Sequence, residues 1–141
     1  MKNMKEFISR SLADTQGIAK RLAATLKGNE IIVLHGGLGA GKTAFCKALA
    51  KALGVKEVVT SPTFTFLKCY QGRFPFYHFD LYRAESEDEV VELGLREYIG
   101  KGVCAIEWNK FGNLGEVTEI SITVDEHTGI RYIKQQVTCC T

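Results

Sequence analysis

The chain has 141 residues, of which 45% are hydrophobic and 24% are charged, a composition typical of one globular domain. Its net charge of +2 is too small to indicate nucleic-acid binding, and no apolar run approaches the ~18 residues of a membrane span. The N-terminus lacks the apolar segment of a signal peptide, and the five cysteines form neither a zinc motif nor a disulfide framework. We therefore expect a cytoplasmic protein without membrane or DNA contacts, folded over residues 1–138, with a tail at 139–141.

The first elements predicted along the chain are a short strand at residues 5–10 and a helix after Ser11. Ser11 and Asp14 have the spacing of a capping box, with Asp in place of the usual Glu. The apolar residues that follow recur every four positions, at Ile18, Leu22 and Leu26. Because Gly28 stands where such a helix would end, this apolar face is interpreted as part of the core.

A glycine-rich loop at residues 36–43 matches the phosphate-binding pattern G-x-x-x-x-G-K-[ST] at every position. Its residues are Gly36, Gly37, Leu38, Gly39, Ala40, Gly41, Lys42 and Thr43. The glycines allow successive N–H groups to point inward, and Lys42 carries positive charge toward the β- and γ-phosphates. The Thr43 hydroxyl can bind Mg²⁺, so the loop predicts a site for a nucleotide and its metal.

The segments on both sides of this loop support the prediction. Residues 30–34 form an apolar run rich in β-branched side chains, which indicates a buried parallel strand. Residues 43–53 contain strong helix formers, and Gly54 follows as a stop signal. Strand, loop and helix therefore come in the order that a phosphate-binding loop requires.

Residues 60–67 begin with a turn signal and then alternate hydroxyl and apolar side chains, which predicts a loop that enters a strand. Residues 71–73 predict a hairpin turn, and residues 74–79 predict the strand that returns to Asp80. Because Pro75 lacks a backbone N–H, the start of this strand is expected at an edge or outside the hydrogen-bonded ladder.

The remaining elements complete the predicted fold. A second capping box at Ser86 opens a helix that Gly94 weakens, and residues 103–106 predict another buried strand before Glu107. Residues 119–124 and 130–137 alternate, which indicates a C-terminal antiparallel hairpin. We expect an α/β, three-layer P-loop NTPase fold whose largely parallel core sheet is extended by antiparallel strands.

Two carboxylates are candidates for the chemistry. Asp80 and Glu107 each follow an apolar strand, so both are expected at the sheet edge beside the loop. One should hold Mg²⁺ and the other should position water, but these spacings do not assign the two roles. His78 is interpreted as a hydrogen-bonded structural histidine. Gly112 stands where a guanine-specificity sequence needs Asp, which favours ATP over GTP.

The motifs in this order resemble those of the TsaE (YjeE) family, the bacterial ATPases of tRNA threonylcarbamoyladenosine biosynthesis. The resemblance spans residues 11–133 and rests on the loop at 36–43, S-P-T-F at 61–64, H-F-D-L-Y-R at 78–83 and E-W at 107–108. It implies ATP and Mg²⁺ as cofactors and hydrolysis that supports the TsaB–TsaD complex, through which tRNA would be an indirect partner. The alternatives are a small-molecule kinase and an assembly module that binds nucleotide without essential hydrolysis.

The resemblance also implies roles for individual residues. Lys42 would bind phosphate and act in catalysis, Thr43 and Glu107 would serve Mg²⁺, and Asp80 would activate water. Thr63 would belong to a switch-like loop. Two further auxiliary residues are expected from their positions alone, Trp108 directly after Glu107 and Arg83 after Asp80. Because residues 36–44 contain no arginine, hydrolysis is expected to be slow without a partner.

The chain departs from the usual family pattern at three positions, which are Gly37, Ala44 and Asn109. The family usually has an acidic residue, a Thr or Ser, and a Pro at these places. Gly37 removes a charge near the phosphates, and Ala44, the last of the expected nucleotide-binding residues, removes a hydroxyl that could contact the α-phosphate. Nucleotide affinity is therefore expected to differ from that of typical members, while Asn109 should alter only the exit from its strand.

Overall fold

The computed structural model describes residues 4–62 and 64–139, which form a seven-stranded sheet in the order β1-β7-β6-β2-β5-β4-β3. The strands are β1 (Met4–Ser9), β2 (Ile31–His35), β3 (Leu67–Gln71), β4 (Pro75–Asp80), β5 (Val103–Glu107), β6 (Glu116–Val124) and β7 (Arg131–Cys139). The helices are α1 (Leu12–Thr25), α2 (Lys42–Ala52) and α3 (Glu87–Glu92), followed by the short 3-10 helix η1 (Leu95–Tyr98).

The centre of the sheet is parallel and both of its sides are antiparallel. Strand β2 pairs in parallel with β5 and β6, and β4 pairs in parallel with β5. Strands β7 and β1 extend one side in antiparallel order, and β3 extends the other. The predicted arrangement of a parallel core with antiparallel extensions is confirmed.

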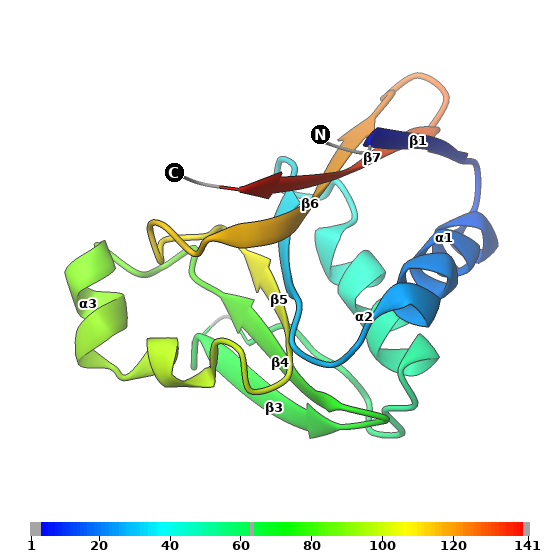
Figure 1. Ribbon diagram of the computed structural model, residues 1–141. Coiled ribbons are helices and arrows are strands. Elements are labelled where there is room, and N and C mark those ends of the chain that lie inside the picture. The colour runs from blue at the N-terminus through cyan, green and yellow to red at the C-terminus, as the bar shows by residue number, and fades with distance from the viewer. Residues whose placement is uncertain (1–3, 63, 140–141) are drawn as a thin grey trace.

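Helices cover both faces of the sheet, with α1 and α2 on one face and α3 on the other (Figure 1). The alternation of side chains along β2 creates the two layers of core. Ile32 and Leu34 belong to the cluster that includes α1 and α2, whereas Ile31 and Val33 belong to the cluster that includes α3. Because both faces of β2 are covered, its sequence is apolar throughout, as a central parallel strand requires.

Both predicted capping boxes are confirmed by hydrogen bonds. The Ser11 hydroxyl accepts from the backbone N–H of Asp14 at 3.1 Å, and the Ser86 hydroxyl accepts from that of Glu89 at 3.2 Å. Helix α1 ends at Thr25, before the expected stop at Gly28. Helix α3 is only six residues long, and Gly94 follows it with φ of 72°, a conformation that favours glycine.

Several boundaries differ from the expectations. Strand β3 begins at Leu67, because residues 64–66 form a turn in which the N–H of Phe66 donates to the Pro62 carbonyl at 2.9 Å. Pro75 is the first residue of β4 and pairs with Gln71 in the ladder with β3, whereas the ladder with β5 begins one residue later. The expectation that this start lies at an edge or outside the ladder is therefore wrong on the β3 side and holds only on the β5 side. Strand β7 includes Cys139, the first residue of the expected tail, and the rest of that tail lies outside the described residues.

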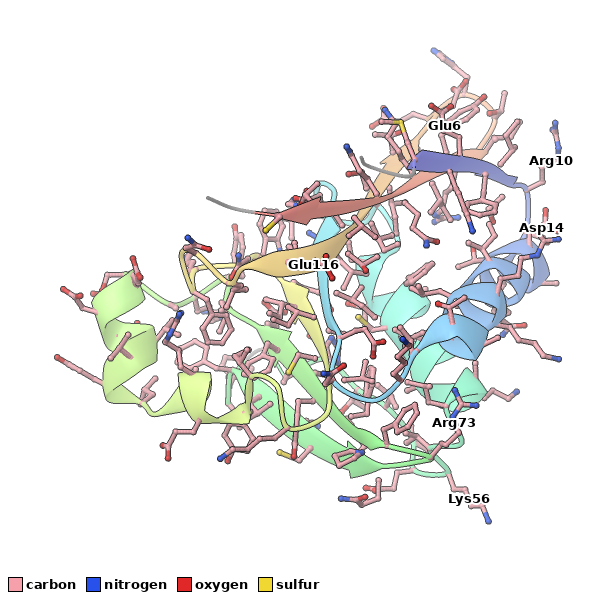
Figure 2. The ribbon with its side chains drawn as sticks, viewed as in Figure 1. Glu6, Arg10, Asp14, Lys56, Arg73 and Glu116 are labelled. Atoms are coloured by element: carbon pink, nitrogen blue, oxygen red, sulfur yellow. The ribbon has the colours of Figure 1, made fainter. Side chains whose placement is uncertain are left out.

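Charged side chains lie on the outside of the layers, for example those of Glu6, Arg10, Lys56 and Glu116 (Figure 2). None of the described helices has both the length and the apolar character that a membrane crossing demands.

The sheet register brings the predicted site residues together. Glu107, the last residue of β5, pairs with Leu34 near the end of β2 and with Asp80 at the end of β4. The carboxyl ends of these parallel strands therefore meet at one edge of the sheet, beside the loop that leads into α2.

Candidate functional site

The glycine-rich loop connects the end of β2 to the first residue of α2, and its shape depends on glycine. Gly41 has φ of 108°, and Gly36 has φ of 154°. A Cβ atom on Gly36 would lie 2.8 Å from the Ile122 carbonyl oxygen, so a side chain there would displace β6. Gly37 is different, because a Cβ atom there would meet nothing within 4 Å. The space beside Gly37 would therefore accommodate a larger side chain.

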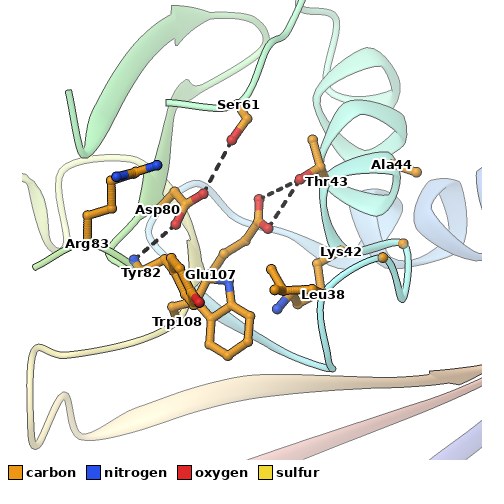
Figure 3. Close-up of a pocket in the computed structure, with 12 residues that line it drawn as sticks. Leu38, Lys42, Thr43, Ala44, Ser61, Asp80, Tyr82, Arg83, Glu107 and Trp108 are labelled. Atoms are coloured by element: carbon orange, nitrogen blue, oxygen red, sulfur yellow. Dashed lines mark hydrogen bonds between the residues drawn. The ribbon is translucent and has the colours of Figure 1, made fainter. Parts of the chain in front are cut away.

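The loop forms one wall of a cavity of about 460 Å³ at the sheet edge (Figure 3). Most of the predicted site residues line it, namely Leu38, Gly39, Gly41, Lys42, Thr43, Ala44, Asp80, Arg83, Glu107 and Trp108. Gly36, Gly37 and Ala40 belong to the loop but do not line this cavity. Thr63 lies outside the described residues.

The Lys42 ammonium is held by the loop itself. Its Nζ donates to the Gly36 carbonyl at 2.6 Å and lies 3.4 Å from the centroid of the Trp108 ring. Burial lowers the pKa of Lys42, and the nearby carboxylates of Glu107 and Asp80 oppose this shift. The structure thus places a buried cation at the mouth of the loop, where an anionic ligand could replace the carbonyl.

Thr43 and Glu107 meet across the cavity. The Thr43 hydroxyl donates to both carboxylate oxygens of Glu107, at 3.2 Å each. Both residues offer oxygen atoms, which are the ligands that Mg²⁺ prefers. Because one side chain comes from the first turn of α2 and the other from the end of β5, the pair links the loop to the sheet.

Glu107 is also fixed from behind by His78. The His78 Nε2 atom lies 2.7 Å from Glu107 Oε2, and the two side chains are 0% and 3% exposed. The interpretation of His78 as a fully hydrogen-bonded structural histidine is wrong for its Nδ1 atom, which is buried and has no partner among the described residues. His78 therefore orients the candidate metal ligand while one of its nitrogens stays unsatisfied.

Asp80 has a different set of partners. Its Oδ1 accepts from the backbone N–H of Tyr82 at 3.0 Å, and its Oδ2 accepts from the Ser61 hydroxyl at 3.3 Å. These contacts tie Asp80 to the segment that precedes Thr63 and not to Thr43. The two carboxylates are thus distinguished by their partners, since only Glu107 bonds to the residue expected to hold the metal.

Aromatic side chains form the outer part of the cavity. The Trp108 ring packs on Tyr82 with 5.0 Å between ring centroids, and the backbone of Trp108 has φ of 55°, which is uncommon outside glycine. The Arg83 guanidinium lies 5.0 Å from the ring of Phe64, a side chain that is 82% exposed. Arg83 therefore lines the cavity while it contacts the predicted switch-like segment.

Comparison with known proteins decides the family. The model of the family described as "Threonylcarbamoyl adenosine biosynthesis protein TsaE" matches residues 9–136. The chain belongs to the TsaE family. TsaE proteins act in tRNA threonylcarbamoyladenosine biosynthesis, and the match covers all the motifs that predicted this family.

Individual TsaE relatives support the same assignment. The chain is 42% identical to TsaE of Treponema pallidum over 118 residues, which are 83% of this chain and 87% of the relative. It is 50% identical to TsaE of Bacillus subtilis over 97 residues, which are 67% of this chain and 60% of that protein. The crystal structure of Bacillus subtilis YdiB is similar with a TM-score of 0.76 and 32% identity, over 96% of this chain and 86% of that one.

Three residues at this TsaE site were not predicted from the sequence. Ser61 and Tyr82 contact Asp80 and lie within the recognised motifs at 61–64 and 78–83, so their membership of these motifs was the available signal. Arg131 lies in β7 and donates from Nε to the Ala40 carbonyl at 3.0 Å, which fixes the back of the loop. No local pattern connects residues 91 positions apart, and only the tertiary fold reveals this contact.

Proposed function

We propose that this TsaE chain binds ATP with Mg²⁺ in the cavity beside the glycine-rich loop and hydrolyses the γ-phosphate. The observation that supports this most is the contact between Thr43 and Glu107, because it places a hydroxyl and a carboxylate beside a buried lysine. This combination of cation and oxygen ligands fits a metal–phosphate group.

Lys42 and the loop would bind the phosphates. The Lys42 ammonium exchanges its hydrogen bond to Gly36 for charge-assisted bonds to phosphate oxygens, which are the stronger contacts. Thr43 and Glu107 would hold Mg²⁺, with His78 keeping the Glu107 carboxylate in place. The metal supplies positive charge that neutralises the phosphate oxygens during the reaction.

Asp80 would position the attacking water. Its carboxylate lines the cavity and is held by Ser61 and Tyr82, so its orientation is set by groups that do not contact Thr43. A carboxylate in this position orients the water and accepts its proton as the phosphoryl group is transferred. Arg83 also lines the cavity, where it would meet the developing negative charge together with Lys42.

Hydrolysis by the isolated chain should be slow and should be accelerated by the TsaB–TsaD complex in the cytoplasm, with tRNA engaged through that complex. Two observations support this part of the proposal. The loop contains no arginine, and the Arg83 guanidinium packs on the exposed Phe64 ring. In P-loop enzymes a group supplied by a partner can raise the rate by about 10³–10⁵-fold.

The test is a reconstitution of threonylcarbamoyl transfer to tRNA with this chain and the TsaB–TsaD complex, with phosphate release measured in parallel. We expect ATP to support repeated turnover, faster with the complex than without it, and a non-hydrolysable ATP analogue to fail. Full transfer with the analogue would show that nucleotide binding alone is the working step. A fast rate that the complex does not change would instead favour a kinase.

A further inference from the structure

Behind the cavity, three buried side chains from different elements converge on the α2 face of the sheet. Cys46 comes from α2, His78 from β4 and Glu107 from the end of β5. One possible ligand atom of each residue lies within 4.8 Å of those of the other two. Cys46 and His78 are 0% exposed and Glu107 is 3% exposed, so the group is enclosed except where Glu107 lines the cavity.

The three groups have the chemistry of a zinc site. A thiolate, an imidazole nitrogen and a carboxylate oxygen are all zinc ligands, and zinc sites with an open position have three protein ligands. The buried Nδ1 of His78 has no hydrogen-bond partner among the described residues, which is uncommon for a polar atom in a core. We propose that Cys46, His78 and Glu107 form a second cation site that takes a thiophilic divalent ion such as Zn²⁺.

The geometry needs small adjustments in both directions. Tetrahedral bonds of about 2.0–2.3 Å place ligand atoms roughly 3.3–3.8 Å apart, so separations near the 4.8 Å limit must close by about 1 Å, and the 2.7 Å hydrogen bond between His78 Nε2 and Glu107 Oε2 must open. Rotamer changes of Cys46 and His78 would supply these shifts. The cavity beside Glu107 provides both the entry path and a water for the fourth position.

Binding requires the Cys46 thiol to lose its proton. The sulfur–hydrogen bond breaks, a sulfur–zinc bond forms, and the proton leaves to solvent through the cavity. Burial raises the pKa of Cys46 well above its ordinary value, with further contributions from Glu107 and Asp80, so the thiol stays protonated without a cation. A bound divalent ion reverses this balance because its charge deprotonates a coordinating thiol.

Occupation of this site would oppose the proposed function, on which this consequence rests. The carboxylate of Glu107 forms hydrogen bonds with both Thr43 and His78. A zinc ion that draws Glu107 toward Cys46 removes it from Thr43 and hence from Mg²⁺. The expected effect is zinc inhibition of ATP hydrolysis that added Mg²⁺ relieves.

Cobalt absorption tests the binding step without any assumption about ATP. The parent protein should be the full chain with Cys69, Cys139 and Cys140 changed to Ser, which leaves two buried thiols. Co²⁺ should give a thiolate-to-metal charge-transfer band in this parent, and Cys46→Ser should abolish it. Cys104→Ser is the matched control, because Cys104 is equally buried but belongs to the core cluster on the α3 face, and it should keep the band.

Zinc competition against the cobalt band gives the affinity, which should weaken by at least tenfold in His78→Ala. Melting curves identify any variant that fails to fold, and the variants that do fold then decide whether the site binds the metal. Absence of the band in the folded parent, or its persistence in Cys46→Ser, would overturn the proposal.

Inhibition of ATP hydrolysis is measured in a separate experiment, in which the rate of each variant with Zn²⁺ is compared with its own rate without Zn²⁺. Cys46→Ser should need at least tenfold more Zn²⁺ for half-inhibition than the parent. Equal inhibition of both would refute the proposed effect on hydrolysis even if the cobalt band is present. A parent without any hydrolysis would instead refute the proposed function and leave the binding result standing.

Discussion

Replacing Lys42 with alanine removes the buried ammonium that the structure places between Gly36 and Trp108. The variant should therefore have a lower affinity for ATP and a lower rate of hydrolysis. Lys47→Ala is the matched control, because Lys47 lies on the same helix but is exposed and does not line the cavity.

The magnitude follows from the bonds exchanged. Two charge-assisted bonds to phosphate oxygens are worth about 3–6 kcal/mol, and release of the Gly36 carbonyl costs about 1.5–3 kcal/mol. In the transition state, where negative charge on the phosphoryl oxygens is greatest, the net loss is about 3 kcal/mol, or ~10²-fold in rate. The ground state gains less from the same cation, so ATP affinity should fall by only about tenfold.

Steady-state phosphate release with the TsaB–TsaD complex measures the rate, and calorimetry measures the affinity. We expect a Lys42→Ala rate about 10²-fold lower and a Lys47→Ala rate equal to that of the unaltered chain. A Lys42→Ala variant that hydrolyses ATP at the normal rate would refute the assignment of this loop as the phosphate site.

Three further predictions use other parts of the structure. Asp80→Asn should keep ATP affinity within about threefold and lower kcat by about 10²-fold in the hydrolysis assay, whereas Glu107→Gln should mainly raise the Mg²⁺ concentration needed; the opposite pattern would exchange their roles. The fluorescence of Trp108, the only tryptophan, should change in a Mg-ATP titration because Lys42 leaves its ring, and a flat titration alongside calorimetric binding would contradict this. The pKa of Glu30 is lowered: burial raises it, but bonds from the backbone N–H groups of the preceding turn outweigh that effect. Glu30→Gln should therefore lower the free energy of unfolding at pH 7 by about 1 kcal/mol, after allowance for solvent screening. Urea titrations should show this difference between the two proteins disappear as the pH falls through the lowered pKa of Glu30.

Much of the fold could be predicted because local patterns and tertiary packing agree. The apolar run at 30–34 became a central strand buried on both faces, and both capping serines begin helices. The start of strand β3 was harder to predict. The alternating side chains at 63–67 are typical of a strand, but a turn at Phe66 places the first residue of the strand at Leu67. Its start is decided by a backbone hydrogen bond to Pro62, which no side-chain period encodes.

The candidate site was predictable where it depends on strand ends and not where it depends on contacts across the fold. The positions of Asp80 and Glu107 followed from the rule that parallel strands present their carboxyl ends at one edge. The partners that distinguish them could not be predicted, since the bond from Ser61 to Asp80 requires the loop conformation. The unsatisfied nitrogen of His78 likewise appears only when all its neighbours are in place.

The central claim is that Mg²⁺ and ATP bind together between Thr43 and Glu107. Calorimetric titration of ATP into the isolated chain, with and without Mg²⁺, tests it most directly. The account predicts one binding event per chain that Mg²⁺ strengthens, and a Thr43→Ala variant in which the effect of Mg²⁺ is largely lost. Binding that is indifferent to Mg²⁺ and to Thr43→Ala, or no binding at all, would contradict it.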